Sequence, residues 1–247
     1  MDPSRNAPAA FDLDVGPCRY RRVVPLRNRV TPSGELIATA ARGTFTGNRG
    51  ILHDADRRIV RTSRLDAWLI CLLEFRGRRR EVMSPGAYTE LFFLDEAVAL
   101  AAGHRPCGEC RRTHYRAYLD AANVGNDDPI AGAKALDGRL KKSRSAERST
   151  AQIASLPDGV FVEMADGDVR LVWDGALHRW TPEGYVEPIV IADAGVVEAT
   201  VVTPSLSVAA LRNGYPVAVH PSVSRLASPA TDVRGRQAND RRPHAAG

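Results

Sequence analysis

Between residues 90 and 122, the apolar positions change from a strand-like run to helical spacing. Phe92-Phe93 is an apolar pair of the kind that ends a strand beneath a helix. Asp95 stands at an N-cap position, and the strong helix formers from Glu96 to Ala102 predict a short helix that Gly103 ends. The next apolar positions recur at i, i+3, i+4 and i+7, which predicts one face of a second helix: Tyr115, Tyr118, Leu119 and Ala122.

Strand-like patterns dominate the rest of the chain. Before residue 90 they cover 22–26, 35–41, 58–62, 68–75 and 78–83, with a polar, glycine-bounded loop at 43–50. After residue 157 they cover 160–164, 169–173, 177–180, 196–202 and 217–220, with Asp-Gly turns at 166–167 and 174–175 and a short helix at 205–212. We therefore predict an α+β fold, with β-hairpins and two helices in the first half and a β-rich C-terminal module.

The domain organisation follows from these patterns and from changes in composition. We expect a disordered N-terminus at 1–19, a first module at 20–125, a basic linker at 126–157, a β-rich acidic module at 158–222 and a disordered tail at 223–247. The basic cluster at 139–144 in the linker is interpreted either as an arm along nucleic acid or as a solvated segment. The loop at 43–50 includes a Gly-Asn-Arg-Gly turn that is able to face a phosphate, although a plain connection between strands is the favoured interpretation.

The overall composition is that of an ordinary globular protein. Of the 247 residues, 44% are hydrophobic and 26% are charged. No apolar run reaches the roughly 18 residues that a membrane-spanning helix needs, and no signal-peptide pattern opens the chain, so a cytoplasmic location is expected. Four cysteines, two of them in one Cys-x-x-Cys, do not match a secreted disulfide framework. Cys18 is expected to be a free surface thiol, with a role as a distant metal ligand as the alternative.

Charge is distributed unevenly along the chain. The formal net charge is +5, but residues 151–210 contain nine acidic and two basic residues, so the remainder is strongly basic. A basic module joined to an acidic one fits a half that binds a polyanion and a half that does not. The alternative is a basic surface that is merely solvated.

Cys107-Gly108-Glu109-Cys110, directly before the second predicted helix, is the main candidate for chemistry. Both sulfurs of a Cys-x-x-Cys can face one ion, and the start of a helix favours thiolate over thiol. The same environment suits a redox thiol, but the βαβ pattern of thioredoxin-like sites is absent. Pro106 and the Arg111-Arg112 pair favour a zinc knuckle.

These residues resemble the metal-binding domain of Ada, the bacterial methylated-DNA response and repair protein. The match runs over about residues 90–112: an aromatic pair, an Ala-rich helix, then Gly103-His104-Arg105-Pro106-Cys107 and Cys110. The resemblance implies a small treble-clef-like module with a zinc site of four thiolates, contact with the DNA backbone, and methylation of one cysteine by a phosphotriester. Over its whole layout the chain resembles uncharacterised bacterial proteins, which imply no function.

The chain departs from the family at its other two cysteines. The resemblance implies two ligands near positions 76–80, which are Arg76-Gly77-Arg78-Arg79-Arg80 here. We therefore expect the methyl-transfer chemistry to be absent. If zinc binds, Cys71 is the expected third ligand and His53 the fourth, because imidazole would complete a Cys₃His site. Cys71 shares an apolar strand face, so a packed core thiol is the competing interpretation, and His53 has the alternative of an ordinary turn residue.

The predicted function is zinc-dependent nucleic-acid binding, in DNA repair or regulation. Backbone phosphates would be contacted by six arginines near the cysteines: Arg78, Arg79, Arg80, Arg105, Arg111 and Arg112. One alternative is an enzyme that acts on an anionic substrate in a pocket between the modules. The other is a structural or partner-binding protein in which the metal only staples the fold. No membrane partner is expected.

Overall fold

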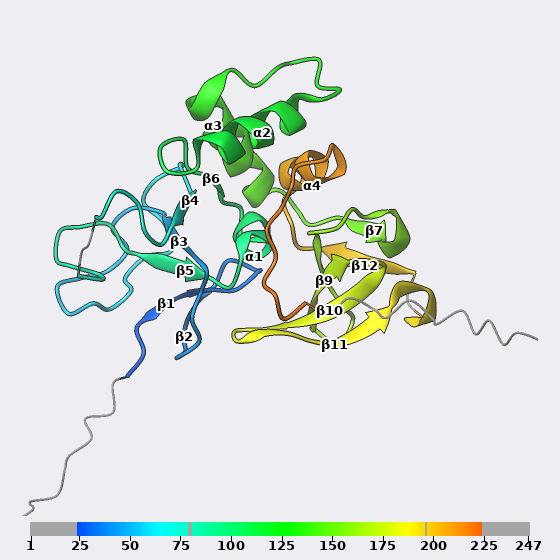
Figure 1. The fold of residues 1–247 in the computed structure, drawn as a ribbon, viewed down its shortest axis with the longest axis horizontal. Helices are drawn as coiled ribbons and strands as arrows, with labels where there is room; N and C mark the ends of the chain where they lie inside the picture. Colours follow the sequence, from blue (N-terminus) through cyan, green and yellow to red (C-terminus); the bar gives the residue numbers. More distant parts are fainter. Residues whose placement is uncertain (1–23, 79–80, 196, 224–247) are drawn as a thin grey trace, which may run out of the picture.

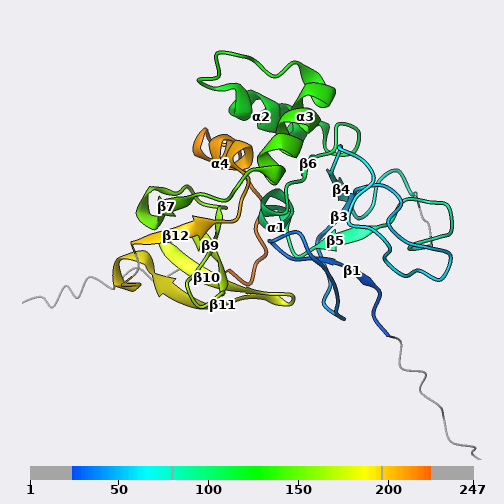
Figure 2. The same cartoon turned by 180° about the vertical axis from the view of Figure 1, so that it is seen from behind.

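The computed structural model describes residues 24–78, 81–195 and 197–223, which form two six-stranded sheets and four α-helices (Figures 1 and 2). The α+β prediction is confirmed at this level. Cys18, Arg79 and Arg80 lie outside the described residues, as do nearly all of the residues predicted to form disordered ends.

The first sheet belongs to the N-terminal half. Its strands are β1 (Arg27–Val30), β2 (Leu36–Ala38), β3 (Phe45–Asn48), β4 (Leu69–Leu72), β5 (Leu91–Phe93) and β6 (Arg105–Pro106). Their spatial order is β2-β1-β5-β3-β4-β6, and the β1–β5 and β4–β6 pairs are parallel while the others are antiparallel. Gly47 is required in β3, because a Cβ there would lie 2.3 Å from the ring of Phe93.

The second sheet is antiparallel throughout. Its strands are β7 (Thr150–Gln152), β8 (Phe161–Glu163), β9 (Val169–Trp173), β10 (Ala176–Thr181), β11 (Gly184–Val190) and β12 (Glu198–Val201), in the order β11-β10-β9-β8-β12-β7. The predicted meander and its two Asp-Gly turns are confirmed, since Gly167 and Gly175 both have positive φ. Two short 3₁₀ turns, Ile153–Ser155 and Ile191–Asp193, flank these strands.

The helices fill the space between and above the sheets. They are α1 (Glu96–Ala101), α2 (Arg112–Asn123), α3 (Gly132–Ser145) and α4 (Ser205–Arg212). Both views show α1 between the two sheets, with α2, α3 and α4 grouped at one end (Figures 1 and 2). The side chain of Asp95 accepts a hydrogen bond from Val98 N, so the predicted N-cap is confirmed.

The start of α1 joins the two halves of the molecule. Asp95 Oδ2 accepts hydrogen bonds from the hydroxyl of Tyr185 at 2.7 Å and from His220 N at 2.9 Å. Next to it, Glu96 accepts from the hydroxyl of Tyr215 and from Ala218 N. One cluster of buried apolar residues runs from the first sheet through α1 into the second sheet.

Several segments differ from the sequence predictions. The predicted loop at 43–50 contains β3, while 58–62 contributes only a bridge between Ile59 and His53. The described parts of 78–83 and 217–220 are not strands. The interval 126–157, predicted to be a linker, contains α3 and β7, and Leu136 and Leu140 on α3 are fully buried at i, i+4 spacing.

Candidate metal centre

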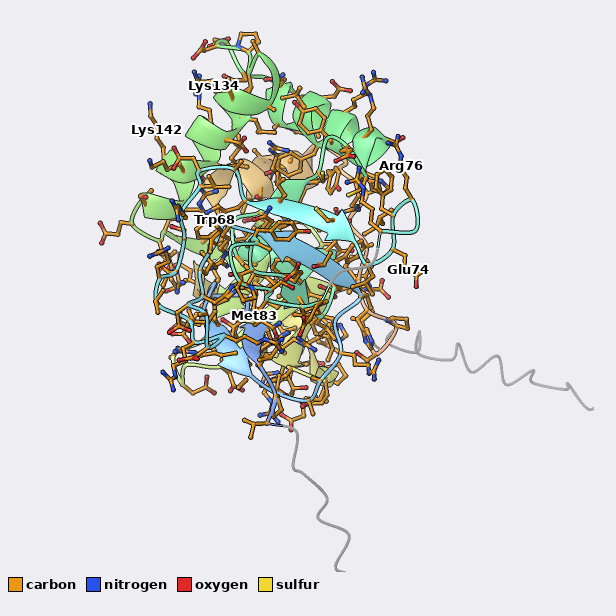
Figure 3. All side chains as sticks on the ribbon, turned by 90° about the vertical axis from the view of Figure 1, so that its left-hand side faces the viewer. Trp68, Glu74, Arg76, Met83, Lys134 and Lys142 are labelled. Atoms are coloured by element: carbon orange, nitrogen blue, oxygen red, sulfur yellow. The ribbon has the colours of Figure 1, made fainter. Side chains whose placement is uncertain are left out.

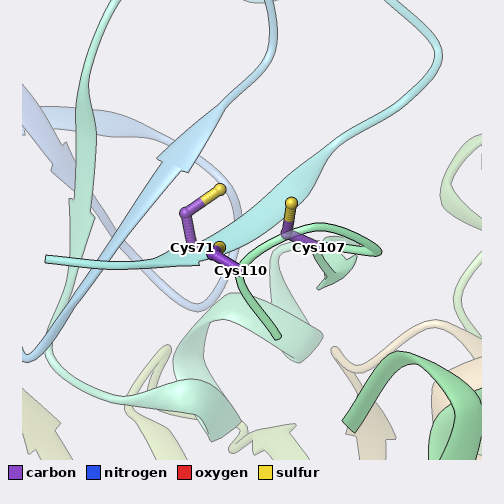
Figure 4. A group of neighbouring side chains, drawn as sticks. All are labelled: Cys71, Cys107 and Cys110. Carbon is purple, nitrogen blue, oxygen red and sulfur yellow. The ribbon is translucent and has the colours of Figure 1, made fainter. Parts of the chain in front are cut away.

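Three of the cysteines converge on one point. The Sγ atoms of Cys71, Cys107 and Cys110 all lie within 4.8 Å of one another (Figure 4). Thiolates bound to one zinc at about 2.3 Å in tetrahedral geometry lie about 3.8 Å apart, so small side-chain movements would close this group on an ion. The chemistry of the donors also fits, because thiolates are the soft ligands that zinc accepts.

The parallel β4–β6 pair brings these cysteines together. Arg105 N donates to Trp68 O at 3.0 Å, and Cys107 N donates to Ile70 O at 2.9 Å. Cys71 and Cys107 therefore follow neighbouring positions at the same end of the strand pair. A hydrogen bond of 3.1 Å from Arg111 N to Cys107 O then closes the turn before α2.

Cys71 therefore lies in the cluster despite its apolar neighbours in sequence. Leu72 and Leu73 are 39% and 49% exposed, so the end of β4 is not deep in the core. Cys71 itself is only half-buried, with its sulfur near the other two. The competing interpretation, a thiol packed in the core, does not describe this position.

The three thiols differ in how readily they ionise. A hydrogen bond from the Cys71 thiol lowers the pKa of Cys107 to about 5, against the opposing effect of burial. The amides of Cys110 and Glu109 also favour the Cys107 thiolate, and Glu109 N lies 3.4 Å from its sulfur. The pKa of Cys71 is raised because it donates to Cys107 and because it is buried. Burial, first of all, raises the pKa of Cys110.

Two buried ion pairs hold the cysteine loop. Arg105 forms a bidentate pair with Asp137 of α3, with both nitrogen–oxygen distances at 2.8 Å. Arg111 pairs with Glu96 of α1 at 2.6 Å, and both of these side chains are almost fully buried. The segment between the two arginines is thus fixed to α3 on one side and to α1 on the other.

Two of the arginines predicted to contact phosphates are buried in these ion pairs, so that part of the prediction is wrong. Arg105 and Arg111 are 4% exposed, so their guanidinium groups do not line a phosphate-binding face. Of the other arginines predicted to bind nucleic acid, Arg112 is exposed at the start of α2. Arg78 is exposed and pairs with Glu109 at 2.8 Å. Sequence reasoning missed Asp137, for which a carboxylate between the helix-spaced Leu136 and Leu140 is the available signal.

His53 is not part of the thiol cluster. Its ring nitrogens lie 2.6 Å from Thr89 Oγ1 and 3.2 Å from Ser84 O. Because Thr89 Oγ1 accepts from Leu52 N, its hydroxyl hydrogen is available to His53 Nδ1, which leaves Nε2–H to donate to Ser84 O. Both nitrogens are therefore engaged in holding the segment before β5. Among the described residues the group has three members, which leaves a fourth coordination position open.

His104 packs and forms hydrogen bonds, as expected from its position in the motif. It is fully buried, with its ring 4.7 Å from that of Phe93 and 5.1 Å from that of Trp68. Burial holds the pKa of His104 well below its usual range, so the neutral ring accepts a hydrogen bond at Nε2 from Arg49 Nε.

No protein-family model, curated protein or solved structure matches this chain. The resemblance of residues 90–112 to the Ada metal-binding domain therefore stays a prediction. Within the described ranges, no helix is long and apolar enough to cross a membrane.

Proposed function

We propose that this protein binds zinc through Cys71, Cys107 and Cys110, and that the metal-held loop supports a surface for the backbone of nucleic acid. The observation that carries the proposal is the convergence of the three sulfur atoms within 4.8 Å. Three thiolates with an open fourth position form a zinc-knuckle-like site in which water or a further ligand completes a tetrahedron. A zinc ion there would join β4 to the start of α2.

Exposed cations near this loop support the second part of the proposal. Arg112 and Arg116 lie on the outer face of α2, immediately after the cysteines. Figure 3 shows Arg76 at one edge of the same side of the molecule and Lys134 and Lys142 of α3 at the other. Guanidinium and ammonium groups spread in this way suit contacts with phosphates, which give affinity without reading sequence.

Metal analysis of the purified full chain tests the first part. We expect one zinc per chain by mass spectrometry of the native protein, because the three thiolates act on one ion. Cys71→Ser should lower the zinc content as much as Cys107→Ser does. Cys18→Ser is the matched control, since it removes the fourth cysteine of the chain and should leave zinc content unchanged. Full occupancy in both Cys71→Ser and Cys107→Ser proteins would end the proposal.

Salt dependence tests the second part. If about five phosphates are contacted, the logarithm of affinity should fall against the logarithm of salt concentration with a slope near −4 to −5. Arg112→Ala and Arg116→Ala should each flatten that slope by about one unit for every sequence tested. Arg179→Ala, on β10 in the acidic half, is the control that should leave it unchanged. Equal loss in the Arg179 control, or no binding at low salt, would remove nucleic acid from the function.

A further inference from the structure

A cavity of about 460 Å³ lies where the first sheet, α1, α3 and α4 meet. Its floor contains Arg49 and the buried segment from Val201 to Pro204, while Arg148, Arg212 and one carboxylate residue, Glu147, are exposed at its rim. Trp68 also lines the cavity, directly before the strand that carries Cys71. The volume is in the range of sites for small organic ligands, roughly 300–1,000 Å³.

Arg49 reaches this cavity with part of its guanidinium group unused. The residue is 1% exposed, yet its Nη2 has no hydrogen-bond partner among the described residues. Its Nε donates to His104 Nε2 at 3.1 Å and its Nη1 to Gly34 O at 2.9 Å. A guanidinium has five N–H donors, so a buried one with two satisfied calls for an acceptor that the described chain does not supply.

A second guanidinium lies nearby, and its hydrogen bonds also go to backbone carbonyls. Arg144 donates to the carbonyls of Gly103 at 2.8 Å and Asp66 at 3.0 Å. In the described part of the chain, neither Arg49 nor Arg144 forms an ion pair with a carboxylate. Burial, and then the charge of Arg144, lower the pKa of Arg49 to about 9, so Arg49 is cationic at neutral pH.

Both guanidinium groups are held in place. Their central carbons lie 3.9 Å and 4.2 Å from the ring centroid of Trp68, for Arg49 and Arg144 respectively. Gly103 has φ of +84°, and a Cβ there would lie 2.3 Å from Arg144 Cδ. A glycine at this position therefore allows Arg144 to extend past the end of α1 toward the cavity.

The start of α4 adds polar groups to the lining of the same cavity. Thr203, Pro204 and Ser205 line it at the N-terminal end of that eight-residue helix, where backbone amides carry partial positive charge. The hydroxyls of Ser205 and Ser143 lie 3.0 Å apart at the lining. Charge-assisted hydrogen bonds from two guanidinium groups, with a hydroxyl beside them, suit the three free oxygens of a phosphate ester.

We propose that this cavity binds a phosphorylated small molecule, with its phosphate between Arg49 and Arg144 and its organic part against the apolar floor. The ligand class is a phosphate monoester of nucleotide or sugar-phosphate size. The site uses none of the cysteines, so it stands independently of the zinc and nucleic-acid proposals.

Calorimetric titration of the full chain tests this site with three probes: a nucleoside monophosphate, ribose 5-phosphate and citrate. We expect saturable one-to-one binding of at least one phosphate ester, and at least tenfold weaker binding of citrate. Arg49→Met and Arg144→Met should each weaken binding of that ester at least tenfold, because each loses charge-assisted hydrogen bonds. Arg139→Met is the matched control, since Arg139 lies on the same helix but pairs with Asp128 outside the cavity.

Thr62→Glu provides a variant that does not touch the core. Thr62 is exposed at the rim of the cavity, so the added carboxylate should leave the fold intact and weaken binding of the phosphate ester at least tenfold. Absence of binding by both esters at about 10 mM would overturn the proposal. Equal affinity for citrate would overturn the phosphate assignment, and unchanged affinity in folded Arg144→Met and Thr62→Glu proteins would place the ligand elsewhere.

Discussion

The two ends of the β4–β6 strand pair differ in the sign of the charge that gathers there. At one end, the sulfurs of Cys71, Cys107 and Cys110 lie together, with Cys107 favoured as thiolate. At the other end, Arg49 and Arg144 stack on Trp68 and have carbonyls and a neutral histidine as their partners. The first end therefore suits a cation and the second suits an anion, although a few residues separate them.

The two buried arginines of the cysteine loop differ from Arg49 in having carboxylate partners. Arg105 and Arg111 are as removed from solvent as Arg49, but each faces a carboxylate at hydrogen-bond distance. Nearness to a motif in sequence does not distinguish these two kinds of arginine. The presence or absence of a carboxylate partner does. Removing one member of a buried ion pair destabilises the fold, because the other charge is left buried alone, whereas a buried cation without such a partner is available to an anionic ligand.

The largest expected effect on stability comes from replacing an arginine that has a buried carboxylate partner. Arg111→Met should lower the free energy of unfolding by about 3–5 kcal/mol, because it leaves the fully buried Glu96 carboxylate without its cation. Urea unfolding followed by circular dichroism measures this change. Arg112→Met, at the next and exposed position, should stay within about 0.5 kcal/mol of the original protein.

A double replacement separates loss of the pair from loss of packing. Adding Glu96→Gln to Arg111→Met removes the uncompensated charge and should recover part of the lost stability. A loss below about 1 kcal/mol in Arg111→Met alone would show that this pair does not anchor the cysteine loop, and the contrast with Arg49 would disappear.

At the thiol end, zinc affinity should depend on pH with a slope set by two protons. Cys107, with a pKa of about 5, is ionised at neutral pH, whereas the raised pKa values of Cys71 and Cys110 keep those thiols protonated. Zinc must displace both protons, so the logarithm of affinity should rise by about two per pH unit between roughly pH 6 and 8. That is about 2.7 kcal/mol per pH unit, at 1.36 kcal/mol for each proton.

Competition with a chelator of known affinity across this pH range gives the slope. Titration in buffers of different ionisation enthalpy counts the released protons directly. Three protons released at pH 7 would mean that Cys107 is not the thiolate of the metal-free cluster, and a slope near zero would mean that zinc binds elsewhere.

Local features were predictable from the sequence. The Asp95 cap and Gly103 delimit α1, and the Asp-Gly turns define the meander, because each depends on a few adjacent residues. The convergence of Cys107 and Cys110 follows from their spacing before a helix. The general α+β class follows from the same local patterns.

Features that depend on distant partners were not predictable. The carboxylate that buries Arg105 comes from 32 residues away, and that of Arg111 from 15 residues away. No local pattern in one sequence specifies such pairs. The same applies to the phosphate-site proposal, since Arg49 and Arg144 lie far apart in the sequence and yet both stack on Trp68. The sequence did not predict α3, because glycines interrupt its pattern and a basic run ends it.

The smallest expected effect on stability comes from replacing Arg49, which has no ion-pair partner among the described residues. This replacement is the direct counterpart of the Arg111 experiment. Arg49→Met should change the free energy of unfolding by less than about 1 kcal/mol. The methionine keeps an apolar stem against Trp68 and removes a buried charge without leaving any carboxylate unpaired. That gain offsets the hydrogen bonds lost to Gly34 and His104, each worth about 1 kcal/mol. Urea unfolding of Arg49→Met and Arg111→Met side by side gives the comparison, because both replacements remove a buried guanidinium. A loss of about 3 kcal/mol or more for Arg49→Met would place it with the structural arginines, whereas near-unchanged stability would mean that the fold does not need its charge, as the anion-site proposal requires.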